Sequence, residues 1–280
     1  MKTIFERISG AMDPEFPGVR FPEPDPDSPS EQYHEASKLY QSTAVGLGAR
    51  IEMFLGHRAL QNAAANPFKV YATHPRVQLP APAPMTMGLN QALLERQCVR
   101  VYDTSTATPL PLVSDWLGWG CGLVHRGAEG SDKVVRTYPS GGGLYPLELY
   151  VAVRNVQDLN AGLYHYNPRE HSLEVLGDAA TAGAVFENLT QREAADSCHF
   201  AVVVTAIFMR SQYKYGERGY RFVLLEAGHL MQNLSLLAPA LGLGMVPIGG
   251  YYDDKLHDLL GVNGVDEAVV YAAAAGLPAE

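Results

Sequence analysis

The sequence predicts an α+β sandwich, in which helices cover a sheet, for most of its 280 residues. Strand patterns and amphipathic helix patterns are mixed along the chain, without the regular alternation that a doubly wound parallel sheet requires. The chain is also long enough, and with 47% hydrophobic residues apolar enough, to bury a core without disulfides or structural metal. We therefore expect one main folded unit.

The first half of the chain shows helical patterns that prolines interrupt. Residues 31–65 place apolar side chains three or four apart, which predicts helix. The prolines between Pro75 and Pro84 then predict an extended connector. Residues 90–102 predict a short helix that continues into a strand, and residues 112–120 predict a helix that ends at a glycine.

The second half of the chain carries most of the strand signals. Alternating or continuous apolar runs predict strands at Leu147–Val153, Phe200–Phe208, Met245–Ile248 and Ala268–Ala275, and a hairpin of Gly162–Tyr166 with Ser172–Leu176. Helical spacing occurs at Arg221–Leu237 and Asp254–Leu260. The first of these two segments is the strongest helix signal in the sequence.

Composition divides the chain into three parts. Residues 1–30 include Gly10–Phe16, which resembles a remnant of an expression vector, and a stretch rich in proline and acids that predicts a flexible arm. Residues 31–85 are the predicted N-terminal helical extension with its proline-rich connector. Residues 86–280 hold the strand signals and the remaining helices, so we expect them to form the main domain.

Composition also excludes several classes of partner. The formal net charge is −9 and lysine and arginine form no runs, so nucleic acid is not an expected partner. The three cysteines form no C-x-x-C pair and are odd in number, which indicates free thiols and a cytoplasmic location. The apolar stretch Leu234–Tyr251 contains prolines and glycines, so we expect no membrane span.

Two arginines, Arg96 and Arg100, lie four residues apart near the predicted end of a helix. A guanidinium group is a rigid fork of donors that matches phosphate oxygens, so the pair could clamp a phosphate monoester. Spacing alone favours the alternative, a solvated helix face, about twofold. The pair therefore indicates a phosphate site only in combination with other signals.

Three consecutive glycines follow Ser140 in the segment Tyr138–Pro146. Glycines let the backbone approach a flat ligand closely, but a tight turn between two elements explains them equally well. The segment lacks the Gly-Lys-Ser/Thr of a phosphate-binding loop and the preceding glycine of a nucleophile elbow. We therefore expect Ser140 to form hydrogen bonds and not to act as a nucleophile.

A third motif immediately precedes the strongest predicted helix. Its Lys214 and Tyr215 are neighbours, and an adjacent ammonium group favours the tyrosinate that a proton-abstracting base requires. A charged aromatic loop explains the same residues equally well. Within the helix, Glu226, His229 and Asn233 share one face, which predicts a polar stripe bonded to itself and no metal site, because a second histidine is missing.

Taken in this order, these segments resemble the nitroreductase-like flavoproteins, and within them the SagB-type or McbC-type dehydrogenases, which oxidise azolines to azoles in peptide natural products. The segments that carry the resemblance are Tyr33–Lys38, Arg96–Tyr102, Pro139–Pro146, Lys214–Phe222, Glu226–His229, Gln232–Asn233 and Val246–Tyr251. The resemblance implies a sandwich with a central, mostly antiparallel sheet flanked by helices. It also implies that residues 86–280 bind FMN at a homodimer interface.

The resemblance further implies which residues contact FMN. It assigns the phosphate to Arg96, Gln97, Cys98 and Arg100, the flavin ring to Pro139, Ser140 and Gly141, and a backbone donor near N5 to Gly249 or Gly250. Cys98 stands where the family usually has serine, which weakens a hydrogen bond. Many nitroreductases add a basic C-terminal phosphate contact that is missing here, so Arg218 or Arg221 would substitute for it.

Lys214 and Tyr215 match a Lys-Tyr pair that the azoline oxidases use. Aromatising an azoline removes a proton from one ring carbon and a hydride from its neighbour, so a base must face the substrate opposite the flavin. The resemblance therefore implies that Tyr215, assisted by Lys214, is the base and that dioxygen reoxidises the flavin. The substrate would be an azoline-containing peptide or a carrier-bound intermediate, which a delivery or synthetase partner protein would present.

Two alternatives remain open from the sequence. The first is an NAD(P)H-dependent reductase of nitro compounds, quinones or flavins, for which rapid bleaching of the flavin by NADPH would be diagnostic. The second is a flavin-free scaffold subunit of a biosynthetic complex, which a colourless protein that cannot be reconstituted with FMN would indicate.

Overall fold

The computed structural model describes residues 27–125 and 134–279. The interpretation of Gly10–Phe16 as a vector remnant therefore lies outside the described residues. Residue contacts divide the chain into two units, and the second unit, which begins at Val45, contains the sheet. This division falls within the predicted extension of residues 31–85.

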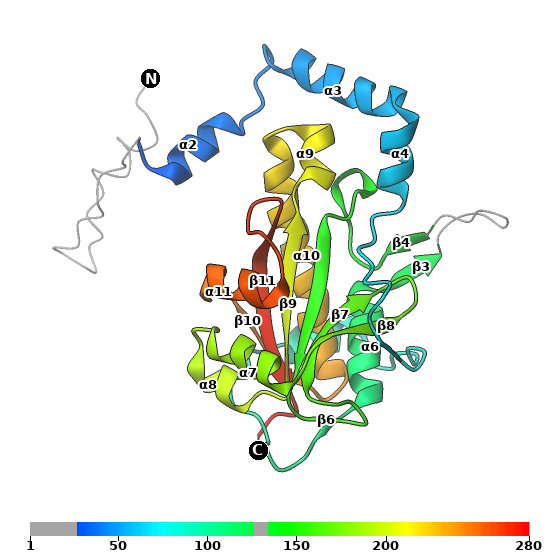
Figure 1. Cartoon of the computed structure of the whole chain (residues 1–280), viewed down its shortest axis with the longest axis vertical. Coiled ribbons are helices and arrows are strands. Elements are labelled where there is room, and N and C mark those ends of the chain that lie inside the picture. The colour runs from blue at the N-terminus through cyan, green and yellow to red at the C-terminus, as the bar shows by residue number, and fades with distance from the viewer. Residues whose placement is uncertain (1–26, 126–133, 280) are drawn as a thin grey trace. The chain divides into compact units, whose positions relative to one another are not determined.

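A seven-stranded sheet is the centre of the described fold (Figure 1). All neighbouring strands in it are antiparallel. In spatial order the strands are β1 (Arg76–Gln78), β8 (Ser172–Gly177), β7 (Gly162–Asn167), β5 (Leu147–Val153), β9 (Phe200–Ile207), β11 (Glu267–Gly276) and β10 (Gly244–Ile248). The mostly antiparallel sheet that the resemblance implied is thereby confirmed.

Helices cover both faces of the sheet (Figure 1). One face packs against α6 (Leu110–Cys121) and α10 (Arg218–Ala240), and the other against α7 (Ala179–Glu187), α8 (Arg192–Ser197) and α11 (Asp253–Leu260). Alternation along β5 explains the two cores, because Leu149 and Val151 face α6 and α10 whereas Tyr150 and Ala152 face the opposite layer. The predicted α+β sandwich is confirmed.

The remaining elements are short or lie outside the main sheet. They are α2 (Pro29–Ala36), α3 (Ala44–Gly56), α4 (Arg58–Ala65), α5 (Leu89–Glu95), α9 (Met209–Tyr215), the pair β2 (Thr108–Pro109) and β6 (Val156–Gln157), and the pair β3 (Leu123–His125) and β4 (Val134–Arg136). None of the helices in the described ranges has the length and apolar character needed to span a bilayer.

The segment of residues 66–75 is fastened to the sheet by buried polar contacts. Lys69 Nζ lies 2.7 Å from a carboxylate oxygen of Glu267, and the backbone N–H of Tyr71 donates to Glu174 at 3.0 Å. Glu174 is fully buried, so loss of the Tyr71 contact would remove one of the donors that compensate its charge. The segment is therefore a packed part of the second unit.

Most predicted elements are confirmed within one to three residues, but two interpretations were wrong. The predicted strand after α5 is absent, because the chain there forms a single bridge, between Tyr102 and Pro278. The segment before α10 is not a loop, because it forms the helix α9. Helices α7 and α8 were not predicted, since their small residues give a weak helical period.

Candidate functional site

The glycine-rich segment turns sharply between β4 and β5. Gly141–Gly143 form one 3-10 turn, in which Gly142 (φ 70°) and Gly143 (φ 68°) adopt the left-handed backbone that favours glycine. A Cβ on Gly142 would overlap the hydroxyl oxygen of Tyr215 and lie 3.0 Å from Lys214 Nζ. The backbone of the turn therefore packs directly against the side chains of Tyr215 and Lys214.

Lys214 and Tyr215 form the C-terminal end of α9, and both are half-buried. The Tyr215 ring packs edge-on against Phe222 of α10, with 4.9 Å between the ring centroids. Lys214 Nζ lies 5.1 Å from the centroid of the Tyr215 ring and 5.2 Å from that of Phe54 in α3. Because an aromatic face attracts a cation, these rings hold the ammonium group beside the tyrosine. We refer to Lys214 and Tyr215 as the dyad.

Ser140 connects the glycine turn to α10. Its hydroxyl donates to Glu226 Oε2 at 2.5 Å and accepts the backbone N–H of Tyr145 at 2.9 Å. Burial raises the pKa of the Glu226 carboxyl to about 7, against the opposing effects of the Ser140 hydrogen bond and the Arg136 charge. Ser140 thus positions the turn through these two hydrogen bonds, and Glu226 can hold a proton near neutral pH.

The predicted polar stripe on α10 does not bond to itself. Glu226 bonds to Ser140 of the glycine turn, and Asn233 donates to the carbonyl oxygen of Gly120 in α6 at 3.3 Å. His229 is exposed. The polar side chains of α10 therefore connect the helix to its neighbours, and the prediction of an internally bonded stripe was wrong.

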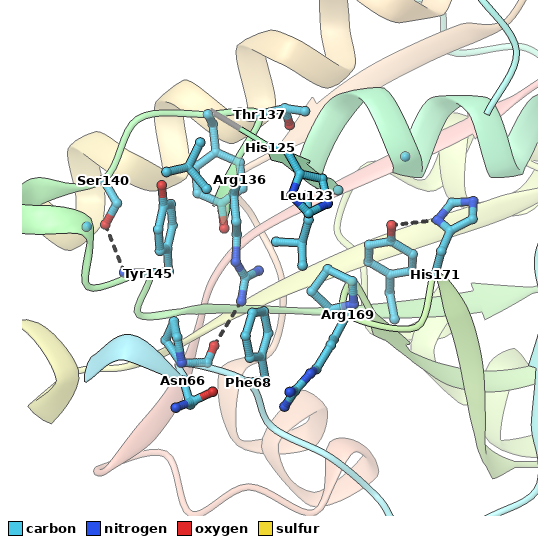
Figure 2. A pocket seen from close by; sticks show the side chains of 18 of the residues that line it. Asn66, Phe68, Leu123, His125, Arg136, Thr137, Ser140, Tyr145, Arg169 and His171 are labelled. Atoms are coloured by element: carbon cyan, nitrogen blue, oxygen red, sulfur yellow. Dashed lines mark hydrogen bonds between the residues drawn. The ribbon is translucent and has the colours of Figure 1, made fainter. Parts of the chain in front are cut away.

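A cavity of about 1320 Å³ lies beside the glycine turn (Figure 2). Ser140 and Gly142 line it, together with residues of α6, β3, β4 and the segment around Phe68. Its described lining residues include Arg136 and Arg169 but no aspartate or glutamate. The wall of the cavity is therefore basic, in a chain whose formal net charge is −9.

The predicted phosphate-binding residues lie on an exposed stretch that follows α5. They are Arg96, Gln97, Cys98 and Arg100. The backbone N–H of Val99, which lies among them, donates to the carbonyl oxygen of Met245 at 2.9 Å. This bond holds the stretch against the free edge of β10, near the beginning of that strand.

The other predicted cofactor residues lie at two further places. Gly249 and Gly250 follow the end of β10, where a Cβ on Gly249 would meet no heavy atom within 4 Å and the Gly250 carbonyl accepts the N–H of Thr190 at 3.0 Å. Arg218 and Arg221 lie in the first turn of α10.

Within one chain, the predicted site residues form two groups. Pro139, Ser140 and Gly141 precede β5 at the end of the sheet where the dyad also lies, because β5 begins opposite Ala206 and α9 follows β9. The arginine stretch and Gly249 instead flank β10, which is three strands from β5, or about 14 Å at the usual strand spacing. The structure thus unites the dyad with the glycine turn and, at the start of α10, with Arg218 and Arg221, and it leaves the arginine stretch of residues 96–100 separate.

Several site residues have no clear sequence signal. Phe54 belongs to the helical extension and reaches the dyad only through the fold. Arg169 lies in a tight turn between β7 and β8, far from the motifs in sequence. Arg136 lies three residues before Pro139, so its position beside the glycine motif was the one available signal.

Comparison with known proteins places the chain in a family. The profile described as "Nitroreductase family" matches residues 93–277, more than half of the chain. The Methanocaldococcus jannaschii protein MJ1384, provisionally named a nitroreductase, is 33% identical over 61% of this chain and 83% of its own.

Two relatives are named as processing proteins. The microcin B17-processing protein McbC of Escherichia coli is 37% identical over 43% of this chain and 46% of its own length. The trifolitoxin-processing protein TfxB of Rhizobium leguminosarum bv. trifolii is 28% identical over 69% of this chain and 54% of its own. The chain thus matches about half the length of each of these two relatives.

Solved structures share the fold. A provisionally named nitroreductase from Anabaena variabilis has a TM-score of 0.64 and 28% identity over 88% of this chain and 45% of its own. A chain of the E. coli microcin synthetase McbBCD complex with truncated pro-MccB17 has a TM-score of 0.56 and 22% identity over 90% and 92%. An Exiguobacterium sibiricum structure in complex with FMN has a TM-score of 0.51 and 12% identity over 70% and 91%. The fold and these matches agree: the chain belongs to the nitroreductase family.

Proposed function

We propose that the protein is an FMN-dependent dehydrogenase that oxidises thiazolines or oxazolines of a peptide to azoles. The observation that carries this proposal is the contact of the Lys214–Tyr215 dyad with the glycine turn. An oxidation of this kind must take a proton from a ring carbon as well as a hydride. A base beside the turn that would border a flavin is the arrangement that the reaction needs.

The dyad supplies the proton acceptor. The Tyr215 phenolate would take the proton from the azoline ring carbon and become the neutral hydroxyl, and the ammonium group of Lys214 would stabilise the phenolate before the transfer. Phe222 and Phe54 shield the pair from water on two sides and fix its orientation. General-base catalysis of this kind typically contributes about 100- to 10,000-fold in rate.

The residues along β10 fit FMN. Arg96 and Arg100 are exposed, and among the described residues neither is in an ion pair, so both forks can meet a phosphate. Gly249 is exposed and lies at the other end of β10 from the arginine stretch, and a Cβ added to it would meet no heavy atom within 4 Å. The five residues of β10 span about 16 Å. When bound there, FMN would supply the hydride acceptor.

A homodimer would complete the site. Leu93 and Leu94 on α5 and Leu224 and Leu225 on α10 have exposed side chains, and the two helices contact each other. We refer to these four side chains as the apolar surface on α5 and α10. Exposed apolar patches of this kind mark interfaces in soluble proteins. A second copy on this surface would bring its own glycine turn and dyad toward the residues along β10, which one chain alone keeps apart.

The relatives support a peptide substrate and a partner protein. McbC and TfxB are named for processing microcin B17 and trifolitoxin, and the structure that contains the McbC fold is a complex with a pro-peptide. We infer that this protein also receives its azoline from a partner or synthetase protein, as a peptide or a carrier-bound intermediate.

The experiment that tests the proposal compares two electron donors for the FMN-loaded protein under anaerobic conditions. An azoline peptide should bleach the flavin absorbance, and admission of air should restore it. Bleaching by NADPH together with no response to azolines would indicate a nitro, quinone or flavin reductase. A protein that cannot be loaded with FMN would indicate a scaffold subunit.

A further inference from the structure

The basic cavity beside the glycine turn has a charge that the proposed reaction does not explain. Two arginines, Arg136 and Arg169, line it, and no described acidic residue does. Of the two lining histidines, His171 is engaged by Tyr166 and Ser114, and burial lowers its pKa, so it adds no charge. The guanidinium groups therefore determine which ligand the cavity accepts.

Among the described residues, Arg136 is a buried cation without an anion in ion-pair distance. Only 4% of the residue is exposed, its Nη2 donates to the carbonyl oxygen of Pro67 at 3.1 Å, and its Nε has no hydrogen-bond partner. The nearest buried carboxylates are already engaged, Glu148 by Arg210 and Glu226 by Ser140, and neither is within ion-pair distance of Arg136. A buried charge and an unmet donor are both costly, which indicates a ligand.

Aromatic rings hold the two guanidinium groups in the wall (Figure 2). Phe68 lies between them, with its ring centroid 5.8 Å from the guanidinium carbon of Arg136 and 5.9 Å from that of Arg169. Tyr138 and Tyr145 lie at 5.9 Å and 5.7 Å from Arg136. Because stacking on rings leaves the edge of a guanidinium group available, its N–H groups can grip a carboxylate.

Two further residues that line the cavity carry unpaired polar atoms. The hydroxyl groups of Thr137 and Tyr138 are buried and have no hydrogen-bond partner among the described residues. Burial raises the pKa of Tyr138, so its hydroxyl stays protonated. Because both hydroxyl oxygens lie below the cavity surface, the group of this wall that would meet an anion is the guanidinium of Arg136.

The cavity also borders the turn that contacts the dyad. Gly142 lines it, and a Cβ added to this glycine would overlap the Tyr215 hydroxyl oxygen and lie 3.0 Å from Lys214 Nζ. Tyr145, which stacks near Arg136, donates its N–H to Ser140 of the same turn. A ligand that places a ring at the dyad can therefore place a neighbouring group at Arg136.

We propose that this cavity is the subsite for a carboxylate of the substrate that flanks the heterocycle, gripped by Arg136 and assisted by Arg169. The assignment of the ligand as part of the substrate rests on the proposed azoline oxidation. The carboxylate is either an acidic side chain next to the heterocycle or the terminal carboxylate of the substrate. The structural alternative is that Arg136 only holds Pro67 in place.

Direct binding tests the site without turnover. The FMN-loaded wild-type protein should bind 2-methylthiazole-4-carboxylate about tenfold or more tightly than the corresponding primary amide, because a buried charged hydrogen bond is lost with the amide. The variant Arg136→Gln should remove this preference, and Arg136→Lys should restore part of it. The exposed Arg169→Gln should reduce it severalfold. Equal affinity of the wild-type protein for both probes would overturn the proposal.

Turnover distinguishes the two sources of the carboxylate. Azoline peptides with aspartate or asparagine beside the ring, and with a free or amidated C-terminus, give four matched substrates. In the wild-type protein, the favoured acidic substrate should have a KM at least tenfold below that of its neutral partner. In Arg136→Gln, this difference in KM should disappear. If Arg136→Gln raises KM equally for acidic and neutral substrates, Arg136 is purely structural. Should Arg136→Gln fail to fold, the same comparison in Arg169→Gln decides, because that side chain is exposed.

The outcomes separate this proposal from the proposed function. Carboxylate-selective binding without azoline turnover would leave the anion site intact and contradict the reaction. Azoline turnover with no preference for acidic substrates would support the reaction and overturn the anion site.

Discussion

Gly142 and Tyr215 touch in this structure: a single Cβ added to the glycine would overlap the phenolic oxygen. The glycine thus has a second role besides permitting the turn: because it has no side chain, the hydroxyl group of the proposed base, Tyr215, can lie next to it. The neighbouring Gly143 has nearly the same φ angle but open space around it. Substitutions at the two glycines therefore distinguish the effect of backbone strain, which both share, from the effect of contact with the dyad, which only Gly142 makes.

Substitution of Gly142 by alanine should displace Tyr215 and abolish most azoline oxidation. Both Gly142→Ala and Gly143→Ala force alanine into a left-handed backbone, at a cost of about 1–2 kcal/mol in free energy of unfolding. Only the first also collides with the dyad. Denaturant unfolding and steady-state kinetics of the two variants test this, and equal activities would show that the contact does not matter.

Glu226→Gln should change how stability depends on pH. Burial raises the pKa of Glu226 from the ordinary 4.5 to about 7, so between these values the folded state keeps a proton that the unfolded state releases. The contribution of the carboxyl group to stability is thus complete below pH 4.5 and is lost as the pH rises to 7. The total loss is at most about 3 kcal/mol.

The measurement is the free energy of unfolding of the wild-type protein minus that of Glu226→Gln, from pH 4.5 to 8. The difference should fall with rising pH, so that glutamine is the more stabilising residue at pH 8. The exposed Glu187→Gln variant controls for the loss of one carboxylate. A difference that does not change with pH would contradict the raised pKa.

Replacing His165 should destabilise the sheet. His165 is fully buried between Glu148, at 3.2 Å, and Glu174, at 2.9 Å. Burial alone would lower the pKa of His165, but the bonds to both carboxylates outweigh it and raise that pKa. His165→Gln removes a shared partner from two buried carboxylates, of which Glu148 keeps its ion pair with Arg210, so we expect a loss of about 3 kcal/mol.

The sign of the pH dependence follows from the raised pKa of His165. The ion pairs stabilise the fold fully below the ordinary histidine value of 6.5 and weaken as the pH rises through the folded value. Urea unfolding should therefore show a larger defect of His165→Gln at pH 6 than at pH 9. The exposed His57→Gln should show none at either pH, and a larger defect at pH 9 would show that His165 is held neutral.

The apolar surface on α5 and α10 should mediate dimerisation. Leu225 is 59% exposed, and a glutamate there would place a charge in the proposed interface. Light scattering should show a dimer for the wild-type protein and a monomer for Leu225→Glu, with loss of bound FMN. The control Val265→Glu changes an even more exposed apolar residue outside this surface. A wild-type monomer that retains FMN would contradict the interface.

The strands were the most predictable part of the fold. Leu147–Val153 was predicted with its observed bounds because its residues other than Glu148 are apolar and Pro146 directly precedes it. The strand predicted after α5 was wrong, since the alternation of Val99 and Val101 is also that of a strand. This stretch bonds to the edge of β10 through Val99 and forms no ladder.

The site was predictable as motifs but not as an arrangement. Lys214, Tyr215 and the glycines are recognisable in the sequence, yet 70 or more residues separate them, and only the order of β5 and β9 in the sheet brings them together. Arg136 and Phe68 have no periodic signal, because their roles depend on a cavity formed by distant segments. Sequence patterns report local periodicity and cannot report such cavities.

The central claim is tested most directly by mass spectrometry of an azoline peptide incubated with FMN-loaded Tyr215→Phe and Lys214→Ala. The matched controls are Tyr213→Phe, an exposed tyrosine of the same helix, and Lys255→Ala, an exposed lysine of α11. We predict that the wild-type protein and both controls remove two hydrogen atoms from the peptide, whereas the dyad variants keep FMN and lose at least about 100-fold in rate. Wild-type rates in both dyad variants would contradict the account.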